Sequence, residues 1–241
     1  MARPDILEVS GVSVQFGGVK ALDNVDFKLG VGELRCLIGP NGAGKTTFFK
    51  CITGQLHPTA GQILFKGQSM SHAESFEIAR AGIGIKTQVP NLFDGLTVNE
   101  NVWLAARRLG GSKKRKSYVD AILERMGVAH LSGFVVGQLA HGQRQLVELS
   151  LVIAADPELV LLDEPAAGMT HDEVGVLADT IRQINKTHAL IVVEHDMQFI
   201  RLIAKDVTVF HQGRILVEGP VETVLSDTMV RDVYLGKPHG E

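Results

Sequence analysis

The segment from Gly39 to Thr47 has the residue types and the spacing that bind phosphate groups. It reads Gly-Pro-Asn-Gly-Ala-Gly-Lys-Thr-Thr and fits the pattern G-x-x-x-x-G-K-[ST]. Its glycines let the backbone turn so that N–H groups point inward, while Lys45 adds a positive charge that reaches the β- and γ-phosphates of a nucleotide. The hydroxyl of Thr46 is suited to bind Mg²⁺. The predicted nucleoside triphosphate site consists of Asn41, Gly42, Ala43, Gly44, Lys45, Thr46 and Thr47.

Two carboxylates follow an apolar run and suit the chemistry of phosphoryl transfer. Asp163 and Glu164 come directly after residues 159–162, which read as a buried strand. Ligands of a parallel α/β sheet bind at the carboxyl ends of its strands, so we expect Asp163 beside the Mg²⁺ ion. Glu164 is expected to polarise the water that attacks the γ-phosphorus. Without the phosphate-binding segment, a solvated acidic turn would explain this pair equally well.

Two further segments are candidate anion sites. His195 follows the apolar run 189–193 after one intervening residue. A histidine beyond a buried strand is more often structural, but at a nucleotide site His195 can donate to the γ-phosphate. Residues 139–143 read Leu-Ala-His-Gly-Gln and open an amphipathic helix, whose N-terminal amides can bind an anion. This turn alone is a weak signal, because many helices begin after a glycine.

Alternating strands and helices are predicted to position these residues. Strands are expected at 6–9, 12–16, 24–29, 61–67, 82–86, 159–162, 189–193 and 207–210. Helices are expected at 46–52, from a capping box at Ser71 and Glu74 to Ala81, and repeatedly between a capping box at Thr97 and Glu100 and residue 155. Thr170 and Glu173 form another capping box. We predict a core of residues 1–88 and 158–241, with antiparallel strands near the N-terminus, and a helical subdomain of residues 89–157.

The composition indicates a globular protein with a large apolar core. The 241 residues are 45% hydrophobic, and a net charge of -3 gives no general attraction for nucleic acid or anionic lipid. We see no N-terminal signal segment and no run of about 18 apolar residues, and therefore expect a cytosolic protein. Cys36 and Cys51 read as core residues, and the basic run 113–116 as a solvated loop that enters a helix.

Taken in this order, the motifs resemble those of the ATP-binding subunits of ABC transporters. The resemblance rests on GPNGAGKTT at 39–47, Gln88, LAHGQ at 139–143, LLDEP at 161–165 and VVEHD at 192–196, and it covers essentially the whole chain. More narrowly, ELRCLIGPNGAGKTT, DEPAAGMT, VVEHDM and the ending VYLG look like the ATPase subunits of branched-chain amino-acid, urea and amide importers, and most of all like the urea-type subunit.

The resemblance implies a fold and a set of residue roles. The fold is α/β, with a P-loop NTPase (RecA-like) core, an antiparallel β subdomain and a helical subdomain. Phe16 would stack on adenine, Gln88 would touch Mg²⁺ and the attacking water, Glu164 would be the general base, and His195 the switch residue. The implied catalytic set is Lys45, Gln88, Glu164 and His195, and the implied Mg²⁺ ligands are Thr46, Gln88 and Asp163.

The resemblance also implies partners. Family members work as dimers that close on two ATP molecules, so the other subunit's site would be completed by Ala140, His141, Gly142 and Gln143. The expected partners are a second ATPase subunit, two membrane permease subunits and, indirectly, an extracytoplasmic solute-binding protein, with no nucleic acid. The chain would lie at the cytoplasmic face of the inner or plasma membrane as a peripheral subunit, with Val89 to Phe93 contacting the permeases.

Two departures from the common family pattern concern the dimer. The usual LSGGQ turn has Ala140 and His141 in place of Ser and Gly, which removes a hydroxyl expected to bond the γ-phosphate. A hydrogen bond to a charged group contributes about 1.5–3 kcal/mol. Residues 167–170 replace an SALD-like loop that carries an aspartate. Both departures favour a heterodimer in which the second ATPase has a more usual turn, with a homodimer as the alternative.

The function expected from the sequence is ATP hydrolysis that powers import of urea, a short amide or a branched-chain amino acid. The nearest alternative is the ATPase of a lipopolysaccharide-type exporter, which has a similar length and a similar ending. A nucleotide-sensing module without turnover is disfavoured by the presence of Glu164 and His195. A DNA-repair or translation ATPase is disfavoured because the chain has one nucleotide-binding unit and no coiled-coil insertion.

Overall fold

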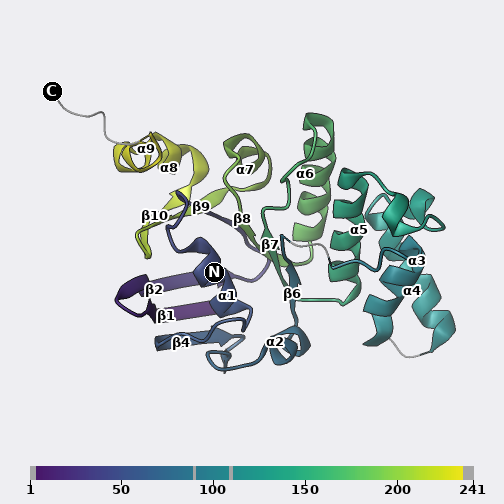
Figure 1. The fold of residues 1–241 in the computed structure, drawn as a ribbon, viewed down its shortest axis with the longest axis horizontal. Coiled ribbons are helices and arrows are strands. Elements are labelled where there is room, and N and C mark those ends of the chain that lie inside the picture. Colours follow the sequence, from purple (N-terminus) through teal and green to yellow (C-terminus); the bar gives the residue numbers. More distant parts are fainter. Residues whose placement is uncertain (1–3, 89–90, 109–110, 236–241) are drawn as a thin grey trace.

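The computed structural model describes residues 4–88, 91–108 and 111–235, and a six-stranded sheet runs through its centre (Figure 1). The strands lie in the order β10-β9-β3-β8-β7-β6. Their bounds are β3 Leu34–Ile38, β6 Ile83–Lys86, β7 Leu159–Asp163, β8 Ala189–Val193, β9 Asp206–His211 and β10 Arg214–Pro220. All neighbours are parallel except β9 and β10, which are antiparallel. Strand β8 and the first four residues of β7 are apolar because both faces of this sheet are covered.

A second, antiparallel sheet is built from the N-terminal part of the chain. Its order is β2-β1-β4-β5, with bounds β1 Asp5–Phe16, β2 Val19–Gly30, β4 Ala60–Phe65 and β5 Gln68–Ser69. The two strands predicted at 6–9 and 12–16 are one strand. Its register with β2 shifts between Val9 and Val12, and Gly11 there has a φ of 60°, so a bulge explains the interrupted apolar pattern.

Helix α1 (Lys45–Ile52) lies between the two sheets. The Phe48 ring packs against Phe27 of β2 at a centroid distance of 5.4 Å and against Phe210 of β9 at 5.1 Å. Side chains alternate along the six-stranded sheet, so that Leu161 and Val193 belong to this apolar cluster while their chain neighbours face the other way. Burial of α1 between the sheets fixes its N-terminus at one edge of the six-stranded sheet.

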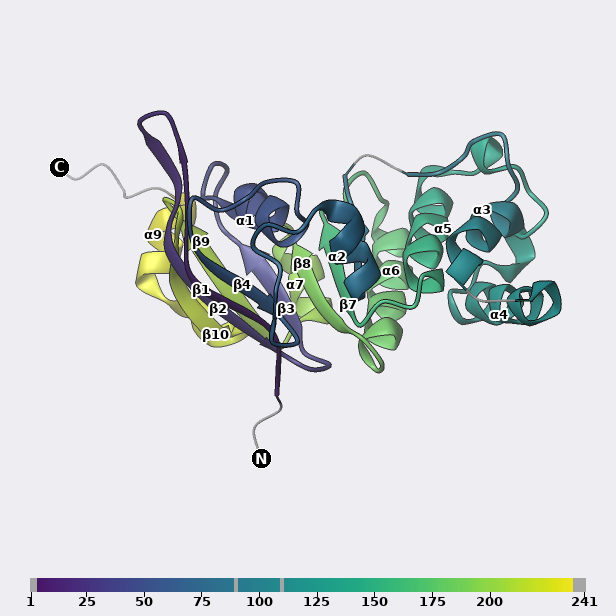
Figure 2. The ribbon, with the colours of Figure 1, turned by 90° about the horizontal axis from the view of Figure 1, so that it is seen from below.

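Helices α3 to α9 contribute to a second apolar cluster, on the other face of the six-stranded sheet. The remaining bounds are α2 Ser75–Ala81, α3 Val98–Ala105, η1 Ala106–Arg108, α4 Ser112–Arg125, η2 Ala129–Leu131, η3 Val136–Gln138, α5 His141–Ala154, α6 His171–Asn185, α7 Met197–Ile203, α8 Val221–Ser226 and α9 Thr228–Leu235. Figures 1 and 2 both place α3 and α4 beyond α5, at the end farthest from β1 and β2. The subdomain boundaries at 89 and 157 stay a prediction.

None of the helices in the described segments combines the length and the apolar character that crossing a bilayer requires.

Two predicted capping boxes are confirmed. Thr97 begins α3 and exchanges hydrogen bonds with Glu100, at 2.8 Å from the Thr97 N–H and 3.2 Å to its hydroxyl oxygen. Thr170 and Glu173 do the same at the start of α6. These side chains satisfy N–H groups that have no partner within the helix.

Two other local predictions were wrong. Ser71 does not begin a helix, because its hydroxyl accepts a hydrogen bond from the Ile63 N–H at 2.9 Å and α2 starts four residues later, with Glu74 and Glu77 as its capping box. The basic run 113–116 lies within α4 and not in a loop before it. The helix begins immediately after Gly111, whose φ of 76° turns the chain.

A buried ion pair joins the edge strand β6 to α5. The Lys86 Nζ lies 3.3 Å from the Glu148 Oε2, and the two side chains are 2% and 4% exposed. Alternation along β6 directs Lys86 to the face that α5 covers. The other oxygen of Glu148 accepts the Asn91 N–H at 3.0 Å, so one carboxylate connects the end of β6, α5 and the chain that follows residue 88.

Replacing Glu148 by alanine should lower the free energy of unfolding by about 3–5 kcal/mol, because Lys86 would remain as an uncompensated buried charge. The double variant Lys86→Met with Glu148→Met should be destabilised less, since it buries no charge. Urea unfolding followed by circular dichroism measures both. Equal destabilisation of the single and the double variant would contradict the proposed cost of the unpaired charge.

Candidate nucleotide-binding site

The register of the parallel strands brings the predicted site residues to one edge of the sheet. Val193 is paired with Asp163 on one side and with Leu37 on the other, so β3, β7 and β8 end at the same level. The Glu164 N–H extends this ladder by donating to the Val193 carbonyl at 2.9 Å. On the far side of β7, Lys86 is paired with Leu162, which places the chain after β6 at the same edge. The phosphate-binding segment, the two carboxylates and His195 therefore all follow strands that end together.

Two glycines of the phosphate-binding segment, Gly39 and Gly44, occupy positions that have no room for a side chain. A Cβ on Gly39 would lie 2.2 Å from the Phe210 carbonyl oxygen, and one on Gly44 would lie 2.9 Å from the Ala21 carbonyl oxygen. Both residues also have positive φ angles, 144° and 108°. Gly44 leads directly into α1, whose first-turn N–H groups face the edge where the strands end.

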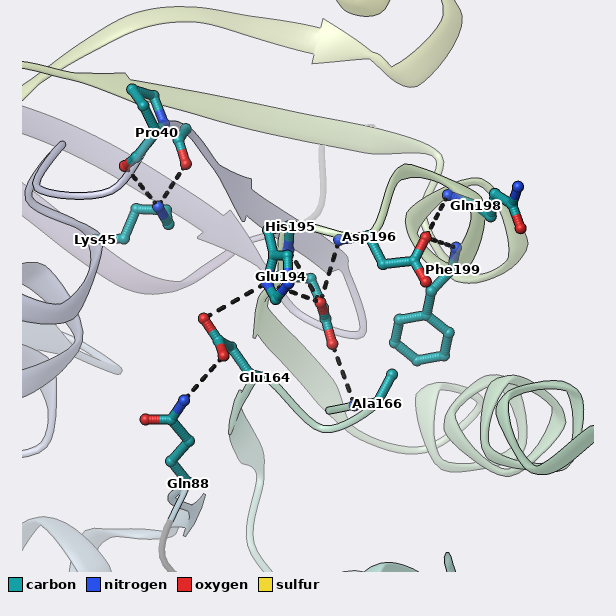
Figure 3. A network of polar contacts seen from close by, with 11 residues as sticks. Pro40, Lys45, Gln88, Glu164, Ala166, Glu194, His195, Asp196, Gln198 and Phe199 are labelled. Atoms are coloured by element: carbon teal, nitrogen blue, oxygen red, sulfur yellow. Dashed lines mark hydrogen bonds and ion pairs between the residues drawn. The ribbon is translucent and has the colours of Figure 1, made fainter. Parts of the chain in front are cut away.

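Lys45 curls back over the loop that precedes it (Figure 3). Its ammonium donates to the Gly39 carbonyl at 2.6 Å and to the Pro40 carbonyl at 3.0 Å. Burial lowers the pKa of Lys45, and the nearby Glu164 and Asp163 carboxylates oppose that shift. Because the two hydrogen-bond acceptors are neutral, the positive charge stays available to an anion bound in the loop.

Glu164 lies between Gln88 and His195 (Figure 3). One carboxylate oxygen accepts from the Gln88 side-chain amide at 2.9 Å, and the other lies 3.5 Å from the His195 Nδ1. The backbone of Glu164 has a φ of 45°, a left-handed conformation that non-glycine residues adopt at a cost of about 1–3 kcal/mol. The structure thus brings three of the four predicted catalytic side chains into direct contact, while Lys45 interacts with Glu164 through space.

Asp163 is half-buried beside these residues. Burial raises its pKa above the ordinary value, and the Glu164 charge adds to the rise, whereas Lys86 and Lys45 oppose it. In the described segments no three His, Cys, Asp or Glu residues are grouped closely enough to hold a metal ion by themselves. One carboxylate with a hydroxyl such as that of Thr46 is the donor set of an Mg²⁺ ion that keeps phosphate and water ligands.

Phe16 ends the first strand of the N-terminal sheet. It is paired with Val19 across the β1–β2 turn, and the two side chains are 54% and 69% exposed. An aromatic ring this exposed is available for stacking on a flat ligand. Stacking of Phe16 on adenine stays a prediction.

The turn at residues 139–143 leads into α5, whereas the phosphate-binding segment leads into α1. Ala140 is the N-cap of α5, and its N–H is accepted by the side-chain oxygen of Gln143 at 3.1 Å. The His141 Nε2 lies 3.0 Å from the Ala167 carbonyl oxygen. Figures 1 and 2 show α5 and α1 on opposite sides of β7 and β8. The two predicted anion sites therefore do not form one site within this chain.

Gly142 packs directly on the first turn of α6. A Cβ at this position would lie 2.2 Å from the Glu173 Oε1. Hydrogen bonds from Thr170, with a smaller one from the Gly142 N–H, lower the pKa of Glu173. The start of α5 and the start of α6 thus share one carboxylate.

Three residues of the site were not predicted to have a role. They are the charged side chains of Lys86, Glu148 and Glu194, each at most 4% exposed. Each interrupts an apolar pattern, at the end of β6, within α5 and directly after β8. A charge within an apolar run is the signal that could have identified them.

The ABC transporter family model matches residues 22–167, which include the phosphate-binding segment and both carboxylates. The chain is 34% identical to the high-affinity branched-chain amino acid transport ATP-binding protein BraF of Pseudomonas aeruginosa, over 98% of this chain and 100% of that protein. It has the same identity and coverage with the high-affinity branched-chain amino acid transport ATP-binding protein LivG of Escherichia coli (strain K12).

Among solved structures, the chain is similar to the ADP conformation of MJ1267, an ATP-binding cassette of an ABC transporter. The TM-score is 0.86 at 28% identity, and the match covers 97% of this chain and 100% of that chain. This likeness over the whole length confirms the fold class expected from the sequence.

Proposed function

This chain belongs to the ABC transporter family and is an ATPase with a P-loop NTPase core, and we propose that it powers an importer of a small nitrogenous solute. The candidate solutes are a branched-chain amino acid, urea and a short amide. The names of the similar transport proteins support the first of these, and the urea-like features of the sequence support the others. The observation that carries the hydrolytic part of the proposal is the contact of Glu164 with both Gln88 and His195.

In the proposed ATP complex, the loop residues Asn41 to Thr47 bind the β- and γ-phosphates through backbone N–H groups. Lys45 exchanges its two carbonyl partners for phosphate oxygens. Thr46, Gln88 and Asp163 would hold Mg²⁺, and the ion would neutralise charge on the phosphate oxygens. Phe16 stacks on the adenine. The carboxylate of Asp163 and the hydroxyl of Thr46, a donor set suited to Mg²⁺, support the metal part of this assignment.

Hydrolysis then depends on Glu164, the carboxylate directly after β7. Glu164 accepts a proton from the water whose oxygen attacks the γ-phosphorus, while the bond from that phosphorus to the bridging oxygen of ADP breaks. The Gln88 amide orients the water. His195 donates a hydrogen bond to the γ-phosphate, and its position 3.5 Å from Glu164 supports a role in the same step.

Replacing Glu164 by glutamine should lower the rate of ATP hydrolysis about 100-fold or more, because general-base catalysis typically contributes that much. ATP binding should persist, so that dimers containing unhydrolysed ATP accumulate and can be counted by gel filtration. Glu158→Gln is a matched control, since Glu158 precedes the same strand at its opposite end and pairs with the exposed Lys66. A Glu164→Gln variant that hydrolyses ATP at the parent rate would rule out this base.

A second ATPase subunit is proposed to complete each nucleotide site. Residues 140–143 lie at the N-terminal, positive end of the α5 dipole and away from α1 of the same chain (Figure 1). They therefore suit a phosphate bound by the other subunit. Because Ala140 has no hydroxyl, we propose a heterodimer whose second subunit supplies the more active turn.

Restoring the hydroxyl with Ala140→Ser should raise the turnover of the purified chain by about tenfold to somewhat over a hundredfold, if the new hydrogen bond acts wholly in the transition state. Phosphate release at saturating ATP measures it. Ala140→Gly changes the same position without a hydroxyl and should not raise the rate. Parent chain that already turns over as fast as Ala140→Ser would contradict the proposed weak site.

The permeases are proposed to contact the segment that follows Gln88, at the cytoplasmic face of the membrane. A cavity of about 470 Å³ opens between β6, α3 and α5. Its lining includes Ile85, Asn91, Phe93, Leu104 and Leu151. An apolar groove of this kind suits a short helix of a partner. Of the expected contact, Val89 and Pro90 lie outside the described residues.

A charge introduced at Asn91 or Leu92, for example Asn91→Asp, should abolish transport by the assembled complex, since the groove would then bury an unpaired carboxylate against the permease helix. Uptake of labelled leucine, urea and acetamide, measured in parallel, also identifies the solute. ATPase activity of the isolated subunit reports that folding is intact. Asn99→Asp places the same charge outside the groove lining and is the control. Unimpaired uptake by the Asn91→Asp and Leu92→Asp complexes would exclude this contact.

A further inference from the structure

Glu194 is a buried carboxylate that binds two different loops of the site (Figure 3). Its side chain is 2% exposed. The Oε1 accepts the Ala166 N–H at 3.1 Å, and the Oε2 accepts the N–H groups of His195 at 2.9 Å and of Asp196 at 3.4 Å. One oxygen therefore binds the loop after β7 and the other binds the loop after β8.

These bonds account for the first backbone donors of both loops. After β7, the Glu164 N–H donates to the Val193 carbonyl, residue 165 is a proline without an N–H, and the Ala166 N–H donates to Glu194. After β8, the Glu194 N–H donates to the Leu37 carbonyl at 3.3 Å, and the next two N–H groups donate to the Glu194 side chain. The carboxylate thus connects the loops after β7 and β8 at the point where the ladder between these strands ends.

A negative charge at this buried position costs free energy that its partners must offset. Burial of an ion without compensation is costly, and the strand that leads to Glu194 is otherwise apolar. The described partners of the carboxylate are the three N–H groups and the His195 ring, whose Nδ1 is 3.8 Å away. An apolar residue would pack here at no such cost, but it would leave the N–H of Ala166 and those of the β8 loop without this acceptor.

We propose that Glu194 is a positioning residue for hydrolysis, which sets the separation of the Glu164 carboxylate from the His195 ring by fixing both of their loops. The inference rests on the roles proposed above for those two side chains. Glu164 is two residues before the bound Ala166, and His195 is itself bound through its N–H. Glu194 touches neither water nor nucleotide in this role and acts through the two side chains that do.

Glutamine is the informative replacement because it has nearly the same shape. Its single carbonyl oxygen can accept from one loop, and its NH₂ group would then face an N–H of the other loop. Glu194→Asp keeps the charge but is one methylene shorter, so it also cannot reach both loops. Each variant should leave one loop without its fixed acceptor.

Glu194→Gln should lower kcat for ATP hydrolysis about 10- to 100-fold, the loss expected when a reacting group is misplaced by about 1 Å. The KM for ATP should stay within about twofold, because the phosphate-binding loop is not bound by Glu194. The fraction of folded sites is counted by ADP binding, and kcat is expressed per folded site. Glu194→Asp serves as the second variant should glutamine prevent folding.

Asn185→Asp is a matched control at the opposite ends of the same strands. The Asn185 amide donates to the carbonyls of Gly32 and His188 at 3.2 and 3.1 Å, just before β3 and β8 begin. Asn185→Asp replaces an amide by a carboxylate, the reverse of Glu194→Gln, in a side chain that also binds two loops. It should lower the melting temperature while kcat per folded site stays at the parent value.

Combining Glu194→Gln with Glu164→Gln separates positioning from general destabilisation. If Glu194 acts by setting the separation of the Glu164 carboxylate from the His195 ring, adding Glu194→Gln to Glu164→Gln should lower the residual rate less than about threefold, because the carboxylate of that pair is already gone. A kcat for Glu194→Gln within about threefold of the parent, an equal loss in Asn185→Asp, or the same loss in the Glu164→Gln background would overturn the inference. A parent-like rate in Glu164→Gln alone would instead overturn the proposed base.

Discussion

Backbone hydrogen bonds among β3, β7 and β8 are the constraint on which the site depends. Val193 is paired with both Leu37 and Asp163, so three strands stop at one level and their next residues share a small volume. The pairing of the strands, and not attraction between the side chains, therefore brings the carboxylates, the imidazole and the ammonium together. The strands in turn need cover on both faces, which α1 with the second sheet provides on one side and the remaining long helices on the other.

Much of this edge could be predicted because its signals are local. The glycine and lysine spacing of residues 39–47 indicates a phosphate loop, and the abrupt end of an apolar run before Asp163 indicates the end of a strand at the edge where a ligand is expected. The Ser71 cap failed because its local pattern competed with a tertiary acceptor role toward Ile63. The interpretation of the basic run 113–116 as a loop rests on its charges and on the glycines before it, whereas the helix there gains its stability from the apolar residues that follow.

The contribution of Glu194 could not be predicted, because it depends on which N–H groups of another loop come within reach. Sequence spacing does not report that Ala166 and His195 lie on either side of one carboxylate. Nor does it report that Gly142 shares a carboxylate with α6, a contact that depends on how two helices pack. Such side-chain to backbone bonds combine residues far apart in the chain and have no periodic pattern.

The curled Lys45 side chain changes how nucleotide affinity should be understood in this protein. Its ammonium already donates to two carbonyls, so binding exchanges these acceptors for phosphate oxygens, and the observed free energy is only the surplus of the new set over the old. Such an exchange favours strongly charged anions, because their attraction to the ammonium exceeds that of the two neutral carbonyls that it gives up.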